Sequence, residues 1–371
     1  MRVLIANPPW FVPIGAPKDK ATQMGIRAGG RWPYTRAIHR NYFPFPFNMA
    51  YADAYLKQNG IDSVMRDCIV HLDEYTDFFK VAKRFDYVVM ETAYASRVND
   101  EFLAKEVAKH SKVILVGPYA TDKAAEVIKR PEVWAVLRGE YEQSLYHCLL
   151  DDLGGVYGFR EWENVDDAPF PTRDASLYQY KMARHPYALN IWGSRGCPFH
   201  CTFCYAQKFQ QGHKYRGHSP ERIEIEIRSV LEHFPKIRYI YFDEDTFNIG
   251  NTRVQEIAKV MKGIGLPWGA MCRADTTSID TFHKMKESGC AEVKIGIESG
   301  SQRVLDEIIG KDLNLEQAVK TVKAVKRMGI KVHGTFMRGF AGETKEERQM
   351  TAQLISSLRC DSHQLSDLRH P

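Results

Sequence analysis

The alternation of short apolar runs with amphipathic stretches is the feature that most constrains the fold of this 371-residue chain. In the first 150 residues, apolar runs end at turn residues, and helical stretches lie between them at 49–58, 100–110 and 121–129. The runs are RVLIANPP (2–9), SVMRDCIV (63–70), DYVVMETA (86–93), KVILVGP (112–118) and WAVLRGE (134–140). Short buried strands that alternate with helices form a parallel sheet covered on both faces. We therefore expect an α/β domain with a doubly wound sheet over residues 1–150, with ligands at the carboxyl ends of its strands.

The second half of the chain repeats this alternation. We expect strands at 188–196, 237–245, 267–275, 291–299, 330–339 and 362–368, and helices at 219–233, 251–264, 278–288, 301–309, 314–328 and 343–358. Repeated strand–helix units close naturally into a full or partial barrel whose site lies at the carboxyl ends of the strands. Residues 151–187, with Gly154-Gly155, an acidic stretch and Pro169-Phe170-Pro171, are typical of a linker between the two parts.

Composition narrows the class of protein. The net charge of +5 is mildly basic, which suits anionic small molecules and does not indicate nucleic acid. No apolar run approaches the roughly 20 residues needed to span a bilayer, and the N-terminus lacks the zones of a signal peptide. We predict a cytoplasmic protein with a small-molecule substrate, no nucleic-acid partner and no membrane span. The Gly- and Arg-rich segment between Phe11 and Phe47 is either an ordered lid or a solvated excursion.

Three of the eight cysteines fall within eight residues, directly after a predicted strand. Cys197, Cys201 and Cys204 have the spacing C-x3-C-x2-C, and soft sulfur ligands favour Zn, Cu(I) or iron–sulfur. A structural zinc site needs a fourth ligand, which His200 could supply from inside the loop. Three cysteines with one position left vacant suit a catalytic 4Fe–4S cluster better. A zinc knuckle or unbound buried thiols are the alternatives.

The loop GCPFHCTFCY (196–205) resembles the signature of the radical S-adenosylmethionine (SAM) superfamily, including the aromatic Phe203 before the last cysteine. The resemblance implies that Cys197, Cys201 and Cys204 bind three irons of a 4Fe–4S cluster, whose fourth iron is chelated by SAM. In that family an electron from the cluster cleaves SAM to methionine and a 5′-deoxyadenosyl radical. The resemblance thus also implies an electron donor such as flavodoxin or ferredoxin.

Motifs at later strand ends resemble the SAM contacts of the same family. The resemblance implies that Asp243 and Asp245, in a D-D-x-F-like motif, lie near the SAM amino group, and that Arg273 binds the SAM carboxylate. It implies ribose and methionine contacts in the motif G-I-E-S-G, at Gly296, Glu298 and Ser299. Met337 lies on the strand that the resemblance places against adenine. Other roles for these side chains stay open. Asp245 could instead be a helix N-cap or lie in a solvated turn, Arg273 could form an ion pair at the barrel rim, and Thr344 is equally well a helix N-cap.

The first half of the chain resembles the cobalamin-binding branch of this superfamily. The resemblance implies a Rossmann-like cobalamin-binding domain and covers N-P-P, G-P-x-A-T and R-G-E. Its implied cofactor-binding residues, all at strand ends, are Asn7, Pro8, Thr92, Gly117, Pro118, Arg138, Gly139 and Glu140. The motif D-x-H-x-x-G, whose histidine binds cobalt in classical cobalamin domains, is absent, and members of this branch commonly lack it. The alternative is a scaffold domain without cobalamin.

Together these resemblances imply a cobalamin-dependent radical SAM enzyme with a partial (β/α)6 barrel over 188–371. The implied reaction is C-methylation: the radical removes hydrogen from an unactivated carbon, methylcobalamin donates the methyl group, and a second SAM restores it. A non-methylating rearrangement or ring closure, or an inactive or regulatory module that senses cobalamin or SAM, are the alternatives. Because the chain ends at Pro371, just after the last predicted strand, we expect a barrel without its C-terminal cap, an exposed apolar edge near 343–371, and a partner that covers the open barrel.

Overall fold

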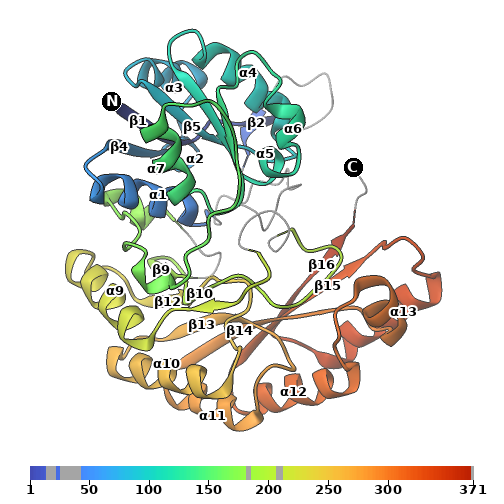
Figure 1. Cartoon of the computed structure of the whole chain (residues 1–371). Coiled ribbons are helices and arrows are strands. Elements are labelled where there is room, and N and C mark those ends of the chain that lie inside the picture. The colour runs from blue at the N-terminus through green and yellow to red at the C-terminus, as the bar shows by residue number, and fades with distance from the viewer. Residues whose placement is uncertain (14–21, 26–42, 181–184, 206–211, 369–371) are drawn as a thin grey trace. The chain divides into compact units, whose positions relative to one another are not determined.

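The computed structural model describes residues 1–13, 22–25, 43–180, 185–205 and 212–368 (Figure 1). The chain divides into two compact units, each with its own sheet and core. The first comprises Met1–Tyr187 with Tyr205–Gly212, and the second comprises Ala188–Cys204 with His213–Pro371. Most of the Gly- and Arg-rich segment expected between Phe11 and Phe47 lies outside the described residues. Its described part is a short antiparallel pair of β2 (Phe11–Pro13) with β3 (Thr22–Met24).

The first unit is built on a parallel six-stranded sheet of order β4-β1-β5-β6-β7-β8. The strands are β1 (Arg2–Asn7), β4 (Asp62–Asp67), β5 (Tyr87–Glu91), β6 (Lys112–Val116), β7 (Ala135–Leu137) and β8 (Gly155–Tyr157). The order reverses between β1 and β5, because β4 pairs with one side of β1 and β5 with the other. This reversal is the topological switch point at which open α/β sheets bind ligands.

Helices cover both faces of this sheet, as expected for a doubly wound fold. They are α1 (Phe47–Gln58), α2 (Cys68–His71), α3 (Tyr75–Ala82), α4 (Arg97–Val107), α5 (Pro118–Asp122), α6 (Ala124–Val127) and α7 (Glu142–Asp151). The core on one face joins α1 and α7 to the strands and includes Ile5, Val89, Leu56 and Leu145. The core on the other face joins α3 and α4 to the strands and includes Leu4, Val88, Phe78 and Leu103.

The first unit differs from the sequence-based expectation at several places, and it contains two helices, α3 and α7, that were not predicted. The strand predicted over 63–70 ends at Asp67, because the Asp67 carboxylate accepts hydrogen bonds from the amides of Ile69 and Val70 and so caps α2. The helix predicted over 121–129 is split into α5 and α6. The segment 151–187, expected as a linker, contributes the edge strand β8 and two short 3-10 helices, Val165–Asp167 and Ala175–Gln179.

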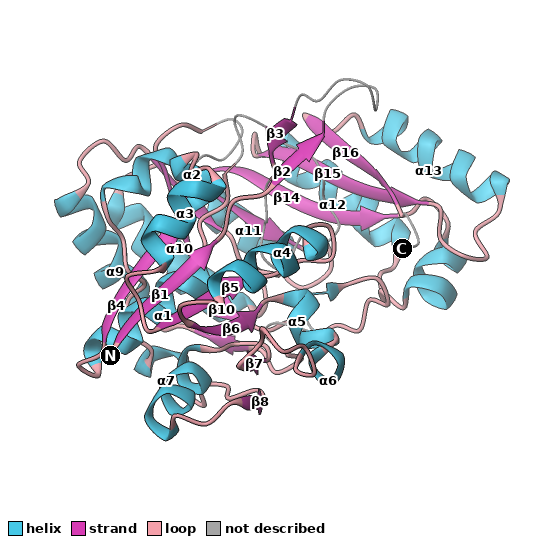
Figure 2. Cartoon of the chain, turned by 90° about the horizontal axis from the view of Figure 1, so that it is seen from above, coloured by secondary structure: helices cyan, strands magenta, loops and turns pink. Residues whose placement is uncertain are grey.

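The second unit contains the six predicted strands as one parallel sheet of order β16-β15-β14-β13-β12-β9. They are β9 (Ala188–Ile191), β12 (Tyr239–Phe242), β13 (Trp268–Cys272), β14 (Cys290–Glu298), β15 (Lys331–Arg338) and β16 (Ser362–Asp367). β14, β15 and β16 run side by side in the same direction (Figure 2). β9 and β16 are the outer strands of this order, which is the arrangement of a partial barrel. A short antiparallel pair, β10 (Ser194–Arg195) with β11 (Arg216–Gly217), flanks the cysteine loop.

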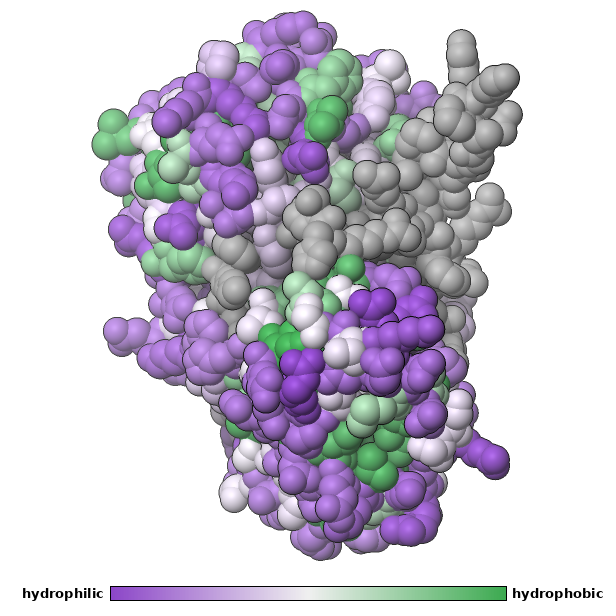
Figure 3. All heavy atoms as spheres, turned by 90° about the vertical axis from the view of Figure 1, so that its right-hand side faces the viewer, coloured by the Kyte–Doolittle hydropathy of each residue, from purple (hydrophilic) through white to green (hydrophobic). Residues whose placement is uncertain are grey.

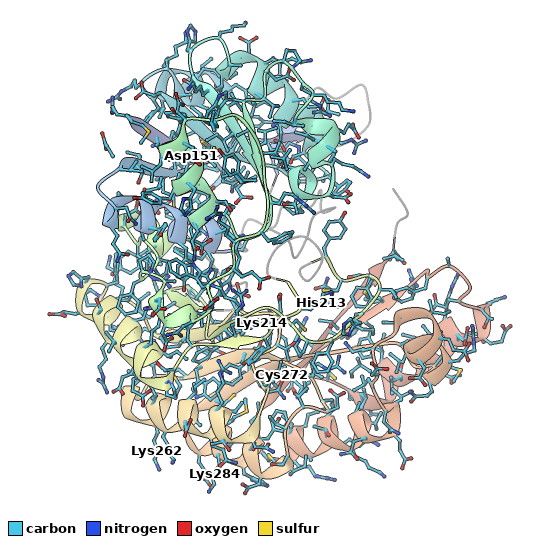
Figure 4. All side chains as sticks on the ribbon, viewed as in Figure 1. Asp151, His213, Lys214, Lys262, Cys272 and Lys284 are labelled. Atoms are coloured by element: carbon cyan, nitrogen blue, oxygen red, sulfur yellow. The ribbon has the colours of Figure 1, made fainter. Side chains whose placement is uncertain are left out.

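The helices of the second unit follow the prediction closely. They are α9 (Pro220–His233), α10 (Asn251–Ile264), α11 (Ile279–Glu287), α12 (Leu315–Arg327) and α13 (Lys345–Leu358), with a π-helix over Val304–Ile309 in place of the predicted helix at 301–309. Cys272 lies inside the unit, whereas Lys262 and Lys284 extend outward from α10 and α11 (Figure 4). This is the amphipathic pattern on which the prediction rests.

The surface agrees with this pattern. Hydrophilic residues cover most of the face shown in Figure 3, and apolar residues form small groups on it. Among the described residues, no helix has the length and apolar character that crossing a membrane requires.

Candidate functional site

The cysteine loop of the second unit begins directly after β10. Cys197 and Cys201 are buried, Cys204 is partly buried, and none of the three forms a disulfide. Gly196 precedes the loop with a φ of 80°, a backbone conformation that favours glycine. The π-helix holds the loop from one side, since Thr202 donates from its amide to the Ile309 carbonyl (2.8 Å) and from Oγ1 to the Ile308 carbonyl (3.0 Å).

The surroundings of this loop combine an apolar wall with nearby cations. Cys201 packs against Val304, Leu305, Ile309 and Phe340. Burial raises the pKa of the Cys201 thiol, and the charges of Lys311 and Arg273 oppose that rise. Three cysteine sulfurs on one loop are a soft donor set that fits iron–sulfur ligation. The described residues contain no group of three or more His, Cys, Asp and Glu side chains placed around a single metal ion.

The segment after β12 packs directly on this loop. Asp243 is held through its backbone, because its amide donates to the Ile191 carbonyl (2.9 Å) and its carbonyl accepts from Trp192 Nε1 (2.9 Å). Thr246 Oγ1 lies 3.7 Å from Cys197 Sγ. The alternative role of Asp245 as a helix N-cap is wrong, since α10 begins at Asn251 with Gly250 as its N-cap.

Arg273 follows β13 and is fixed from several directions. Its Nε and Nη2 donate to the two carboxylate oxygens of Asp275 at 2.9 and 2.7 Å, and Nη2 also donates to the Lys311 carbonyl at 2.9 Å. The guanidinium lies 3.6 Å from the centre of the Phe199 ring, which belongs to the cysteine loop. The ion pair at the barrel rim, which the sequence offered as an alternative role for Arg273, is therefore present. The Arg273 guanidinium also lies against the cysteine loop.

Glu298, at the end of β14, forms a buried ion pair. Lys311 Nζ lies 3.3 Å from Glu298 Oε1. Glu298 has a φ of 72°, which is uncommon for a non-glycine residue and marks local strain. A Cβ at position 296 would overlap Glu298 Oε1, so a side chain there would require the Glu298 carboxylate to move. Sequence reasoning missed Lys311, whose only signal is its place in the loop after a predicted helix.

Two further predicted SAM contacts have structural partners. Ser299 Oγ accepts from the Ser301 amide (3.1 Å) and lies 3.4 Å from Thr351 Oγ1 of α13. Met337, near the end of β15, packs in the apolar wall around Cys201 together with Phe203. In the loop between β15 and α13, Glu343 Oε2 accepts a hydrogen bond from the Gly339 amide at 2.6 Å.

Thr344 follows that loop and caps α13. Its Oγ1 accepts from the Glu347 amide, and its own amide donates to Glu347 Oε2 (2.9 Å), which completes a capping box. The capping role expected for Thr344 is confirmed.

In the first unit, the predicted residues lie along the carboxyl edge of the sheet, on both sides of its switch point. Asn7 Nδ2 donates to Asp67 Oδ1 at 2.9 Å, which joins the ends of β1 and β4. Burial raises the pKa of Asp67 to about 6, although several hydrogen bonds to its carboxylate lower that pKa. They come from Val70, Ile69, Asn7 and Tyr180. Pro8 is buried beside Asn7.

Thr92 and Gly117 join the ends of β5 and β6. Thr92 Oγ1 donates to the Val116 carbonyl (2.6 Å) and accepts from the Ala120 amide (3.1 Å). Gly117 has a φ of 93°, and a Cβ there would come 2.5 Å from the Thr92 carbonyl oxygen, so glycine is required. Pro118 begins α5.

The R-G-E motif follows β7. Gly139 has a φ of 68°, and a Cβ there would overlap the ring of Phe159. The Arg138 guanidinium lies 5.4 Å from the centre of that ring, and Glu140 is fully buried. Glu91, which the sequence places at the end of a strand but which was not among the predicted cofactor-binding residues, accepts through Oε1 from the hydroxyl of Tyr141 (2.9 Å) at the same edge.

The chain is similar to known proteins of one superfamily. The family model of the radical SAM superfamily matches residues 193–355. An uncharacterized methyltransferase of Pyrococcus horikoshii is 32% identical over 350 residues, which cover 86% of this chain and 75% of that protein. The cytidylyl-2-hydroxyethylphosphonate methyltransferase of Streptomyces wedmorensis is 33% identical over 205 residues, which are 50% of this chain and 38% of that enzyme.

Solved structures share the fold of the whole chain. The radical SAM methyltransferase TsrM from Kitasatospora setae, in a structure with cobalamin and a [4Fe-4S] cluster, superposes with a TM-score of 0.72 at 13% identity over 99% of this chain and 72% of its own. The cobalamin-dependent SAM radical enzyme OxsB superposes with a TM-score of 0.71 at 16% identity, over 95% of this chain and 51% of its own. This chain therefore spans about half the length of OxsB and less than half of the Streptomyces enzyme.

Proposed function

Because the chain belongs to the radical SAM superfamily, we propose that it is a cobalamin-dependent methyltransferase that acts on an unactivated carbon of a small molecule. The observation that carries the proposal is the cysteine loop of the second unit, which follows β10 and lies close to two ion pairs, the buried pair Lys311–Glu298 and the pair of the buried Arg273 with Asp275. The methyltransferase names of the relatives and the shared fold of TsrM and OxsB support it.

Cys197, Cys201 and Cys204 would hold the 4Fe–4S cluster. None of them forms a disulfide, and the residues around Cys201 are mainly apolar, which excludes water from the side of the loop that they cover. When bound, the cluster and SAM supply a 5′-deoxyadenosyl radical, and cobalamin supplies the methyl group. An electron donor of the flavodoxin or ferredoxin kind would reduce the cluster.

The strand ends next to the loop would bind SAM. The methionine part of SAM carries both an ammonium and a carboxylate, and this edge offers both signs of charge in buried side chains. Glu298 can accept hydrogen bonds from the ammonium or from ribose hydroxyls. Arg273 and Lys311 supply the cations for a carboxylate. The existing bonds of Arg273 to Asp275 hold its guanidinium in one orientation, so little side-chain entropy is lost on binding.

The carboxyl edge of the first unit would bind cobalamin. Asn7, Thr92 and Gly117 lie along it, and the close approaches at Gly117 and Gly139 leave no room for side chains there. Asn7, Thr92 and Arg138 supply polar groups at the same edge that could meet corrin amides. The sequence contains no D-x-H-x-x-G motif, so the residues that would hold cobalamin do not include a histidine of that motif.

The test is purification from cobalamin-fed cells, followed by anaerobic reconstitution with iron and sulfide. We expect a cobalamin absorption spectrum that stays with the protein, and release of 5′-deoxyadenosine when SAM and a reductant are added. Cys201→Ala should abolish that release, whereas Cys360→Ala, outside the loop, should keep it. A protein that holds iron but no cobalamin would contradict the methyltransferase proposal.

A further inference from the structure

Thr246 contacts one of the cluster cysteines from the segment between β12 and α10. Its Oγ1 lies 3.7 Å from Cys197 Sγ, within hydrogen-bond range for sulfur. Both residues are buried, at 4% and 6% exposed. In a free thiol either atom could donate, but a thiolate that ligates iron carries no proton. If the cysteine loop holds a cluster, the Thr246 hydroxyl must therefore be the donor.

The backbone around Thr246 keeps this hydroxyl in place. The amide of the next residue, Phe247, donates to the Met271 carbonyl at 2.8 Å, and the Phe247 side chain is fully buried. On the other side, Asp243 is bonded through its backbone to Ile191 and Trp192, which precede the cysteine loop. The Thr246 segment is thus held by β13 on one side of the contact and by the residues before the cysteine loop on the other. A hydrogen bond fixed in this way counts for more in a buried site than it would in water.

A donated hydrogen bond stabilises the more negative, reduced state of a cluster, because it offsets negative charge on the ligating sulfur. Hydrogen bonds to sulfur are among the factors that set cluster potentials. Resting on the proposed function, we propose that Thr246 is a positioning residue that donates to the Cys197 sulfur and raises the reduction potential of the cluster.

The loop offers a matched control. Thr202 lies between Cys201 and Cys204, but its hydroxyl donates to the Ile308 carbonyl at 3.0 Å. Thr202→Val therefore removes a hydroxyl from the cysteine loop itself without removing the Thr246–Cys197 contact. Thr246→Val removes the proposed donor and keeps the shape of the side chain, and Thr246→Ser keeps the hydroxyl.

The experiment is a redox titration of the reconstituted full-length protein, monitored by the electron paramagnetic resonance (EPR) signal of the reduced cluster. At a fixed potential, Thr246→Val should lower the ratio of reduced to oxidised cluster about tenfold, which corresponds to about 59 mV for one electron. Thr246→Ser should stay close to the wild type, and Thr202→Val should shift the ratio much less. If Thr246→Val does not assemble a cluster, Thr246→Ala removes the same hydroxyl and must show the same lowering.

The outcomes separate this inference from the proposed function. An unchanged potential in the hydroxyl-deleting variants, or an equal shift in Thr202→Val, overturns the role of Thr246 while the cluster itself stands. A wild-type protein that assembles no iron–sulfur cluster overturns the proposed function, and this inference with it.

Discussion

Lys311 Nζ lies 3.3 Å from Glu298 Oε1, and both side chains are less than a tenth exposed. Breaking a buried ion pair from one side leaves an uncompensated charge, so we expect Lys311→Met to lower the free energy of unfolding by about 3 kcal/mol. Lys320→Met is the matched control, because Lys320 pairs with Glu316 on the exposed surface of α12, where ion pairs contribute little. Urea unfolding measures both. Equal effects of the two variants would show that the Glu298 pair is not buried as described.

The buried Asp67 carboxyl should make stability depend on pH. Its folded pKa, about 6, lies above the ordinary 3.8, so the folded state holds the proton more tightly than the unfolded state. Asp67 therefore contributes its full stabilisation below pH 4 and loses it as the pH rises to about 6. The free energy of unfolding should fall by roughly 3 kcal/mol over this range because of Asp67. Asp67→Asn stays neutral and can still accept from Asn7 and cap α2.

The measurement is the difference in unfolding free energy between Asp67→Asn and the wild type from pH 4 to pH 8. We expect this difference to grow in favour of the variant up to about pH 6 to 7 and to be flat above. Parallel stability curves over the whole range would contradict a raised pKa at Asp67.

Gly139 should not tolerate a side chain, whereas Gly158 should. Gly139→Ala introduces a Cβ into a backbone with φ 68° and into the Phe159 ring, so we expect a loss of about 2 kcal/mol or more. Gly158→Ala is the control, since nothing lies within 4 Å of a Cβ there. Thermal unfolding of the two variants makes the comparison. On the proposed function, Gly139→Ala should also weaken cobalamin retention, and a variant as stable as Gly158→Ala would contradict the close approach.

The capping box of α13 gives a smaller expected effect. Thr344→Ala removes the oxygen that accepts from the Glu347 amide, which should cost about 1 kcal/mol of stability. Thr344→Ser keeps the cap and should lie within a few tenths of the wild type. Denaturant titration at neutral pH resolves the two. A loss in the serine variant as large as in the alanine variant would show that the methyl group, not the cap, matters.

Much of the fold followed from local patterns in the sequence. Apolar runs such as DYVVMETA predicted β5, and the strand–helix alternation predicted all six strands of the second unit, because fully buried parallel strands read as continuous apolar segments. The edge strand β8 was missed, since Gly155–Tyr157 is too short to form a pattern. The strand predicted over 63–70 extends beyond the end of β4 at Asp67, because the apolar Ile69 is equally compatible with a strand and with α2.

The candidate site was predictable where it depends on local spacing. Cys197, Cys201 and Cys204 are close in sequence, so their spacing alone places them on one loop. Lys311 reaches Glu298 across 13 residues. Thr246 reaches Cys197 across 49 residues. Such contacts depend on how strand ends meet in space. A single lysine or threonine in a loop belongs to no sequence pattern from which the contact could be predicted.

The most direct test of the central claim, that the three cysteines hold a four-iron cluster to which SAM binds, is the EPR spectrum of the anaerobically reconstituted, reduced protein with and without SAM. We predict the signal of one reduced 4Fe–4S cluster per chain, which changes when SAM is added and is lost in Cys201→Ala. A protein that takes up only zinc, or an iron–sulfur signal that SAM leaves unchanged, would contradict the claim.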